Sequence, residues 1–325
     1  MKYFITGATG FVGSYLAKEL LEREHTVFAS YRKESSFKLW DDIKKKQVSW
    51  VEVDILDPLG MLHYTKDVDV VIHCAAFVSL DSKMKKLLHQ INVEATANLV
   101  NVCLENKVPK FCFISSVAAL GKPFDGKYVN ENCKWEKSES LTAYSVSKFY
   151  AEQEVWRGVA EGLNALIVNP SVVLGVGDWS SSSLKIFEYL STNPTYYPTG
   201  TFNYVDVRDV AEMTIDLIDK NIFGERFILN GGHLSFKDFF EMAAKTLNFK
   251  APTQEMTPFI AKIGIFIDLL VSLLTNKPRR ITNDTYKATA REYVFLSNKV
   301  RKELGRDFRG LNETLDWIGK NSKKT

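Results

Sequence analysis

Apolar residues follow two alternating patterns over the first 170 positions of the chain. Helical spacing of apolar residues covers residues 11–23, 87–106 and 144–160. Between and around these segments lie short apolar runs typical of buried strands, at residues 1–5, 26–30, 48–54, 68–74, 111–114 and 163–168. Strands that alternate with helices in this way predict an α/β fold, a Rossmann-type doubly wound parallel sheet with right-handed crossovers.

Beyond residue 170 the alternation loosens. Residues 175–200 are rich in Gly, Ser, Thr and Pro, and we expect them to form a substrate loop. Helical spacing returns over residues 205–219, and a short strand is predicted at residues 226–229. From residue 235 onward the pattern is mostly helical.

A chain of 325 residues is long for one hydrophobic core. We expect a nucleotide-binding domain of residues 1–170, to which residues 204–232 return. Residues 171–203 and 233–325 would then form a smaller, mostly helical C-terminal substrate lobe.

Residues 258–274 are very apolar, and only Lys262 and Asp268 interrupt the segment. The segment falls short of the roughly 20 apolar residues that span a bilayer. We therefore expect a buried or interface helix without membrane contact, and keep monotopic membrane contact or dimer packing as alternatives.

Composition changes this picture little. Apolar residues make up 45% of the chain and the net charge is only +3, which indicates a soluble globular protein and gives no argument for nucleic acid as a partner. The four cysteines form no CxxC pair and no pairing with histidine, so we expect free thiols and no metal. Because the first strand starts at once and leaves no room for a signal peptide, we expect a cytoplasmic protein.

A glycine-rich turn follows the first strand and carries the clearest chemistry. Gly7, Gly10 and Gly13 fall three apart, and the first helix starts at once behind them. Glycine lets the backbone approach phosphate oxygens, and the helix N-terminus supplies free N–H groups and a positive dipole end. We therefore predict that this turn, with Thr9, Phe11 and Val12, binds the pyrophosphate of a dinucleotide.

The end of the second strand distinguishes the two nicotinamide cofactors. The chain reads Ser30-Tyr31-Arg32-Lys33, with no acidic residue before Glu34 to accept a ribose 2′-hydroxyl. We expect NADP(H), with Arg32 as the main contact to the 2′-phosphate and Lys33 helping, and keep NAD(H) as an alternative. The competing interpretation is that both cations are merely exposed.

Two further segments are candidates for contacts to the dinucleotide. Asp54, followed by Ile55, can accept a hydrogen bond from an adenine amino group, although it can equally cap the next helix, where Asp57 suits that role better. The small residues of Cys74-Ala75-Ala76 let the backbone pass close beneath the cofactor.

Tyr144, Lys148 and Ser116 are the candidate catalytic residues. Tyr144 and Lys148 are four apart on one helix face, and Ser116 follows the fifth strand. A nearby ammonium favours the phenolate, so we expect Lys148 to lower the pKa of Tyr144 and to hold the ribose of the cofactor. Tyr144 would exchange a proton with a carbonyl or alcohol during hydride transfer, while Ser116 orients the substrate oxygen.

At this point the chain resembles the extended short-chain dehydrogenase/reductase family over essentially its whole length. The matching pieces are Thr6 to Gly13, Asp54 to Asp57, Cys74-Ala75-Ala76, Asn92-Val93, Ser115-Ser116, Tyr144-x-x-x-Lys148, Asn169-Pro170-Ser171 and Tyr204 to Val210. The resemblance implies that Ser116, Tyr144 and Lys148 are catalytic, and that Asn92 has a structural or relay role beside them. It also implies that Pro170 borders the nicotinamide, and we add Ser171 and Val173 as cofactor-binding candidates.

Within that family the chain is most similar to the dihydroflavonol-reductase-like branch, which includes bacterial relatives described as epimerases. Leu120-Gly121 stands where sugar epimerases carry Tyr-Gly, and Val117-Ala118 stands where sugar dehydratases carry an Asp-Glu pair. A dehydratase is therefore disfavoured. An NADP(H)-dependent reductase is the main hypothesis, with a cofactor-retaining nucleotide-sugar epimerase and a non-catalytic cofactor-binding protein as alternatives.

Aromatic residues and arginines beyond residue 170 are the candidates for binding the substrate. Five aromatic residues lie where the family's pocket forms, and they predict either an apolar or ring-bearing ligand or the core of the lobe: Trp179, Phe187, Tyr196, Tyr197 and Phe202. An epimerase would need cations for a diphosphate, for which the candidates are Arg208, Arg279, Arg280 and Arg291. The resemblance also implies a homodimer that pairs helix 87–106 with the helix of Tyr144.

Overall fold

The computed structural model describes residues 1–121, 126–135, 141–275, 282, 286 and 289–322. Its centre is a seven-stranded sheet in the order β11-β7-β5-β4-β1-β2-β3, in which every neighbouring pair of strands runs parallel. The strands are β1 (Lys2–Thr6), β2 (Thr26–Tyr31), β3 (Ser49–Glu52), β4 (Val70–His73), β5 (Lys110–Ile114), β7 (Ala165–Pro170) and β11 (Glu225–Leu229). The predicted doubly wound parallel sheet is confirmed.

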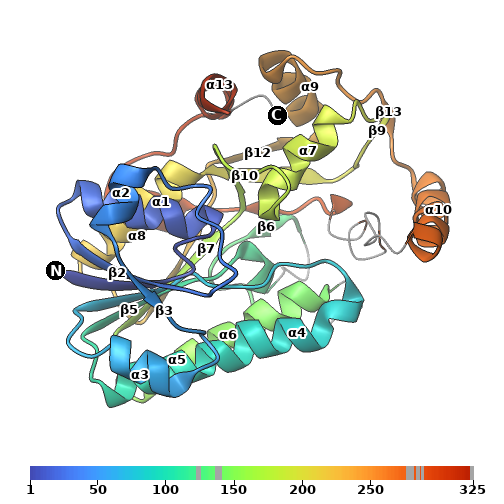
Figure 1. Ribbon diagram of the computed structural model, residues 1–325. Coiled ribbons are helices and arrows are strands. Elements are labelled where there is room, and N and C mark those ends of the chain that lie inside the picture. The colour runs from blue at the N-terminus through green and yellow to red at the C-terminus, as the bar shows by residue number, and fades with distance from the viewer. Residues whose placement is uncertain (122–125, 136–140, 276–281, 283–285, 287–288, 323–325) are drawn as a thin grey trace.

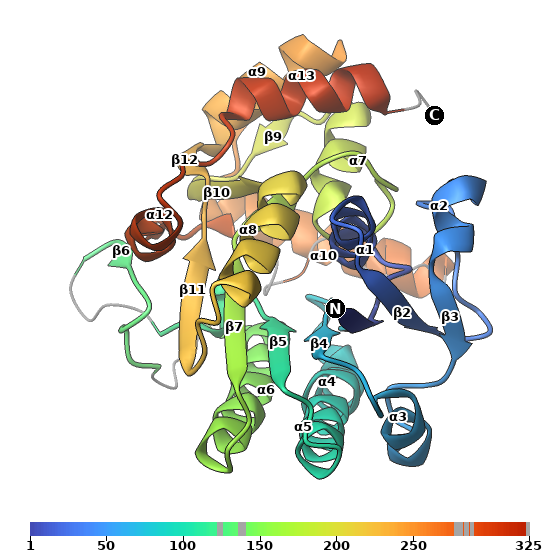
Figure 2. The same ribbon diagram turned by 90° about the vertical axis from the view of Figure 1, so that its left-hand side faces the viewer.

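Helices cover both faces of this sheet (Figure 2). One face carries α1 (Phe11–Glu22), α2 (Asp42–Gln47) and α8 (Val207–Asp219), and the other carries α3 (Pro58–Tyr64), α4 (Lys85–His89), α5 (Ala95–Glu105) and α6 (Ala143–Ala160). The apolar strand residues fill two buried clusters, one on each side: Ile5 packs with Leu16, while its neighbour Phe4 packs with Leu99. This double coverage explains why the strands read as continuous apolar runs.

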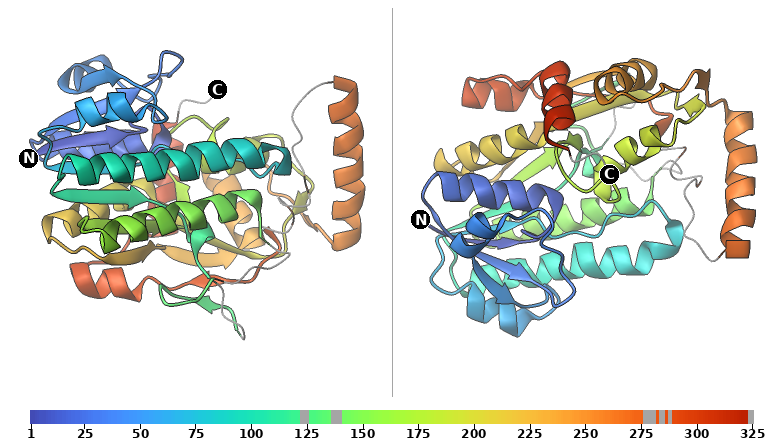
Figure 3. Two further views of the ribbon diagram at one scale, coloured as in Figure 1. Left: turned by 90° about the horizontal axis from the view of Figure 1, so that it is seen from below. Right: turned by 45° about the horizontal axis from the view of Figure 1, so that its top comes forward.

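The predicted helix 87–106 is a single helical rod with an interruption. A π-helical turn, Gln90–Glu94, joins α4 to α5, and the combined rod runs beside α6 across one face of the molecule (Figure 3). A π-turn inserts an extra residue into the helical ladder and is frequently found at functional sites. It holds Asn92, which the sequence pattern treats as an ordinary mid-helix residue.

A second group of elements lies beyond the carboxyl ends of the central strands (Figure 1). Its three-stranded sheet has the order β12-β10-β8. The group consists of β8 (Val172–Leu174), α7 (Lys185–Ser191), β9 (Tyr196–Tyr197), β10 (Thr201–Asp206), β12 (Gly232–Ser235), α9 (Phe236–Leu247), β13 (Gln254–Glu255), α10 (Pro258–Thr275) and α13 (Leu311–Asn321). The remaining elements are β6 (Tyr128–Val129), β14 (Val294–Phe295), α12 (Asn298–Leu304) and three short 3₁₀ turns, Ser82–Met84, Val117–Ala119 and Ser182–Leu184.

Residues 175–200 are not the plain loop that their composition predicts. They contain α7, whose Phe187 and Leu190 are fully buried together with the preceding Leu184. These three apolar residues fall three apart, a helical spacing that the surrounding Ser and Thr residues obscure. Phe187 and Phe202 are core residues of this region, since both are buried and their rings pack on Phe239.

Helix α10 stands at the side of the molecule (Figures 1 and 3). Phe259 is 72% exposed and Ile263 is 45% exposed, whereas Ala261 is buried. The expectation of a buried helix is therefore wrong for this part of α10, and that of an interface helix stays a prediction. Among the described residues, no helix is both long and apolar enough to cross a membrane. The four cysteines are free, and Cys103 and Cys112 are buried as expected.

Candidate functional site

The turn after β1 has no room for a side chain at Gly7 or Gly13. Gly7 has φ +76°, and a Cβ atom on it would lie 2.7 Å from the backbone of Ala75. A Cβ on Gly13 would lie 2.2 Å from the carbonyl oxygen of Gly7. The turn is therefore pressed against the start of α1 on one side and against the segment that follows β4 on the other, which brings Cys74, Ala75 and Ala76 next to it as predicted.

The N-terminus of α1 is open. Gly10 is its N-cap, and no side chain of the described residues caps the helix. Trp40 steadies the turn by donating a hydrogen bond of 3.0 Å from its indole to the carbonyl of Ala8. An uncapped helix start behind a turn without side chains fits the pyrophosphate of a dinucleotide, and Thr9, Phe11 and Val12 would offer backbone N–H groups to it.

Arg32 and Lys33 follow β2, and both side chains are exposed. Within the described ranges neither forms an ion pair; the backbone N–H of Arg32 donates to the Ser35 hydroxyl at 3.0 Å. The two cations are thus free to bind a phosphate, which fits the predicted contact but equally fits ordinary surface residues.

Asp54 and Asp57 divide their tasks much as the sequence suggests. The carboxylate of Asp57 accepts a hydrogen bond of 3.1 Å from the N–H of Gly60 and caps α3, whose first residue is Pro58. The exposed carboxylate of Asp54 accepts from the N–H of Leu56 at 2.9 Å and keeps further lone pairs for a ligand. Ile55 is half-buried against the core.

Ser116 and Tyr144 come together although they lie 28 positions apart in the sequence. Ser116 follows β5, and Tyr144 lies in the first turn of α6, whose N-terminus is capped by the Thr142 hydroxyl. Burial raises the pKa of Tyr144 to about 12, against the lowering effect of a hydrogen bond with the Ser116 side chain. The phenol is therefore protonated at neutral pH.

Lys148 lies one turn after Tyr144 and is buried. Its ammonium donates a hydrogen bond of 2.9 Å to the carbonyl of Ile114 and lies 4.4 Å from the centre of the Phe113 ring. Burial lowers the pKa of Lys148 to about 8. The expected lowering of the Tyr144 pKa by this ammonium is not found, because burial of the phenol dominates and Lys148 is turned towards β5.

Asn92 connects the π-turn to the candidate catalytic helix. Its side-chain amide donates to the carbonyl of Phe77 and to the hydroxyl of Ser147, both at 2.9 Å, and its oxygen accepts from the N–H of Phe77 at 2.8 Å. Ser147 in turn donates to the carbonyl of Tyr144 at 2.8 Å. Asn92 thus holds the backbone beside Tyr144, which agrees with the structural role that the resemblance implies.

Pro170, Ser171 and Val173 lie where β7 passes into β8. All three residues are buried, and the backbone N–H of Ser171 donates a hydrogen bond of 3.0 Å to the carbonyl of Leu229. The hydroxyl of Ser171 is buried and has no hydrogen-bond partner among the described residues. An unpartnered buried hydroxyl at the carboxyl edge of the sheet fits a polar ligand.

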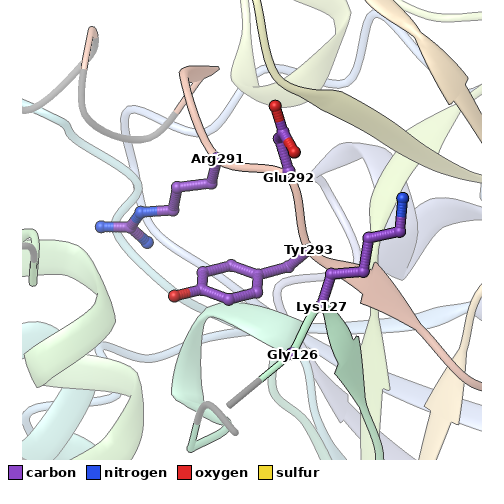
Figure 4. Close-up of a pocket in the computed structure, with 5 residues that line it drawn as sticks. All are labelled: Gly126, Lys127, Arg291, Glu292 and Tyr293. Carbon is purple, nitrogen blue, oxygen red and sulfur yellow. The ribbon is translucent and has the colours of Figure 1, made fainter. Parts of the chain in front are cut away.

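A pocket of about 480 Å³ lies between the residues before β6 and those before β14 (Figure 4). It is lined by Gly126, Lys127, Arg291, Glu292 and Tyr293. Tyr293 packs against the cluster that includes Val117, which follows Ser116.

Of the arginines considered for a diphosphate, Arg291 lines this pocket. Arg208 is bound by Asp206 at 2.6 Å and lies over the Trp317 ring, so it is not available. Arg279 and Arg280 lie outside the described residues.

Three buried residues that support the site were not assigned roles from the sequence. His73 connects β1 to the Asn92 turn, and Glu152 and Asn169 lie behind Ser116. Two signals were available: Asn169 belongs to the matching piece Asn169-Pro170-Ser171, and Glu152 is an acidic residue four positions after Lys148 on the same helix face.

The sequence matches the model of the NAD dependent epimerase/dehydratase family over residues 3–228. A candidate dihydroflavonol 4-reductase of Synechocystis sp. is 29% identical over 93% of this chain and 89% of its own length. Cinnamoyl-CoA reductase 1 of Petunia hybrida is 26% identical over 96% of this chain and 89% of its own length. The solved structure of gox2253 has a TM-score of 0.81 at 30% identity, covering 98% of both chains.

Proposed function

Because the chain belongs to the NAD dependent epimerase/dehydratase family, within the extended short-chain dehydrogenases/reductases, we propose that this NAD(P)-dependent oxidoreductase reduces a ketone or aldehyde with NADPH. The observation that carries the proposal is the meeting of the Ser116 and Tyr144 hydroxyls at the carboxyl edge of the sheet. The glycine turn opens at the same edge, where dinucleotides bind in doubly wound folds.

Tyr144 is the proposed proton donor. With its pKa raised to about 12, the phenol holds its proton at neutral pH, which suits protonation of a carbonyl oxygen better than deprotonation of an alcohol. Ser116 orients that oxygen by hydrogen bonding, and Lys148 holds the ribose hydroxyls of the cofactor. When bound, the reduced nicotinamide supplies the hydride.

The preference for NADP(H) over NAD(H) rests on the exposed Arg32 and Lys33 behind β2 and on the lack of an acidic residue there. A guanidinium matches the geometry of a phosphate and binds it more strongly than it binds a ribose hydroxyl.

The substrate class is proposed from similarity to the reductases. Dihydroflavonols and cinnamoyl-CoA, the substrates in those relatives' names, carry a carbonyl near an aromatic ring. We propose a ring-bearing ketone or aldehyde, bound between the nucleotide-binding domain (residues 1–170 and 204–232) and a substrate lobe (residues 171–203 and 233–325).

We further propose a cytoplasmic homodimer. The rod of α4 and α5 lies beside α6 on one face, and Leu87 and Tyr150 on these helices are 37% and 48% exposed. Apolar side chains at such positions fit a four-helix contact with a second copy. Light scattering of the purified protein would measure the mass directly.

One observation favours a second candidate, a nucleotide-sugar epimerase. Two cations, Lys127 and Arg291, line the same pocket together with Glu292, and their charged ends point to opposite sides of it (Figure 4). The UDP-glucose 4-epimerase of Thermotoga maritima shares the fold, with a TM-score of 0.79 at 18% identity over 98% of both chains.

The test is a cofactor-coupled screen of ketones, aldehydes and nucleotide sugars, with mass spectrometry of the protein as purified. The reductase consumes NADPH in step with product and exchanges it at every turnover. Turnover of a nucleotide sugar without net change in absorbance at about 340 nm, with cofactor retained on the protein, identifies the epimerase instead. A protein that binds cofactor and turns over none of these compounds is a non-catalytic binder.

A further inference from the structure

Glu152 places a carboxylate deep inside the protein, directly behind the proposed catalytic residues. It lies on α6, four residues after Lys148 and eight after Tyr144, and it is fully buried. Burial disfavours the ionised form and raises the pKa of Glu152, whereas the Ser115 hydroxyl, Arg226, Asn169 and Lys148 all act in the opposite direction. A buried carboxylate is retained only where its partners compensate for lost water.

Both carboxylate oxygens are engaged. One accepts a hydrogen bond of 2.6 Å from the side-chain amide of Asn169, and the other pairs with the guanidinium of Arg226 at 3.1 Å. Arg226 belongs to β11, so the pair links the catalytic helix to the edge strand of the sheet.

Asn169 connects the carboxylate of Glu152 to the backbone of Ser116. The same amide nitrogen that donates to Glu152 donates its second hydrogen to the carbonyl of Ser116 at 3.0 Å. The Asn169 amide oxygen has no partner among the described residues. Turning the amide over would set this oxygen against a carboxylate and a carbonyl, so Glu152 fixes the amide in the orientation that holds Ser116.

Glu152 also interacts electrostatically with the ammonium of Lys148. The titratable groups that act on that ammonium are Glu152 on its own helix, His73 at the end of β4 and Cys74 directly after β4. Tyr144 lies one helical turn before Lys148. Burial keeps His73 neutral, lowering its pKa to about 3, and keeps Cys74 a thiol by raising its pKa to about 12. Glu152, which pairs with the guanidinium of Arg226 at 3.1 Å, is then the group in this set that can carry negative charge beside the ammonium.

We propose that Glu152 is a positioning residue for the reduction, which orients Ser116 through Asn169 and stabilises the charged form of Lys148. The inference rests on the proposed function, since it concerns the same Ser-Tyr-Lys site. It gives the buried pair of Glu152 and Arg226 a role beyond the stability of the fold.

The first experiment follows Lys148 itself, without turnover. In protein labelled with ¹³C at the lysine ε-carbon, the Lys148 signal is assigned by its loss in Lys148→Met and titrated by NMR. In Glu152→Gln, which keeps the shape of the side chain and removes its charge, the midpoint should fall by about one pH unit or more relative to the wild type. Glu154→Gln is the matched control, since this acidic residue pairs with Arg157 on the partly exposed side of the same helix. An unchanged midpoint in folded Glu152→Gln overturns the proposal.

The second experiment uses the pH profile of the reductase. Loss of the Lys148 proton at high pH should begin about one pH unit lower in Glu152→Gln, with kcat reduced roughly tenfold or more and KM altered less. Glu154→Gln should keep the wild-type profile. Failure of the wild type to reduce any carbonyl contradicts the proposed function and leaves the NMR titration to decide on Glu152.

Glu152→Asp covers the case in which Glu152→Gln does not fold. It keeps the charge and shortens the reach to Asn169, so the Lys148 midpoint should stay near the wild-type value while kcat falls. A wild-type kcat in Glu152→Asp overturns the orienting role, and a lowered Lys148 midpoint in it overturns the electrostatic one.

Discussion

The hydroxyl of Thr6 and Nδ1 of His73 lie 2.7 Å apart at the carboxyl ends of β1 and β4. Nε2 of the same ring lies 3.0 Å from the Thr96 hydroxyl, which donates its own proton to the carbonyl of Asn92 at 2.6 Å. Thr96 must therefore accept from Nε2–H, which leaves Nδ1 to accept from Thr6. A neutral imidazole thus joins the strand of the glycine turn to the π-turn of Asn92.

Stability should fall on mild acidification because of His73. Burial lowers its pKa from about 6.5 to about 3, so between these values the unfolded chain binds a proton that the folded protein excludes. Folding free energy is then lost as pH falls through 6.5, by about 2 kcal/mol at pH 5. Urea unfolding at pH 7 and pH 5 measures this loss.

The matched variants are His73→Gln and His63→Gln, since His63 is exposed. His73→Gln should be less stable at pH 7 but lose less stability on acidification. His63→Gln should keep the wild-type dependence. The same loss in all three proteins would rule His73 out as the source.

Tyr144→Phe should abolish nearly all reduction while leaving NADPH affinity within a few-fold. Removal of a positioned proton donor costs roughly 10²–10⁴-fold in kcat. Tyr150→Phe is the control, because this tyrosine lies on the same helix with 48% of its surface exposed. Steady-state kinetics and a fluorescence titration with NADPH give both quantities, and a Tyr144→Phe enzyme with normal kcat would refute the assigned role.

Arg32→Ala should weaken NADPH binding roughly 10- to 100-fold and NADH binding much less, because only NADPH carries the 2′-phosphate that a guanidinium binds. Lys33→Ala should have a smaller effect in the same direction. Lys245→Ala, an exposed cation on α9, should alter neither affinity. Equal weakening of NADPH and NADH by Arg32→Ala would contradict the assignment of the cofactor.

Gly13→Ala should disturb both stability and cofactor binding, since the new methyl would meet the carbonyl oxygen of Gly7 at 2.2 Å. We expect a loss of about 3 kcal/mol and NADPH affinity at least tenfold weaker. Gly310→Ala is the control: nothing lies within 4 Å of the methyl there, and its cost should stay below about 1 kcal/mol. Thermal melting and NADPH titration measure the two effects, and a Gly13→Ala protein that matches Gly310→Ala would show that the turn relaxes.

The sheet could be predicted from the sequence because strands covered on both faces leave uninterrupted apolar runs. The glycine turn could be predicted because Gly7 and Gly13 stand at positions with no room for a side chain. The spacing of Tyr144 and Lys148 likewise fixes their common helix face. The sequence also gave reason to seek Ser116 nearby, since it follows the strand next to β7 in the sheet.

The features that escaped prediction depend on packing between distant segments. Asn92 lies in a π-turn that leaves no periodic signal, and α7 is hidden by its Ser and Thr neighbours. The pKa of Tyr144 follows from how deeply the phenol is buried, which the i,i+4 spacing does not report. Glu152 is a charged residue whose burial depends on Asn169 and Arg226 from two other strands.

The strand at one border of the central sheet is synthesised late. β11 pairs with β7, but 54 residues separate the end of one from the start of the other, and β8, α7, β10 and α8 are made in between. During synthesis, the backbone N–H and C=O groups along one edge of β7 stay unpaired until residue 229 has emerged from the ribosome. A fragment cut after residue 200 would keep every residue of the glycine turn and yet expose the unpaired edge of β7 to aggregation. The nucleotide-binding half is therefore not a separable unit of this chain.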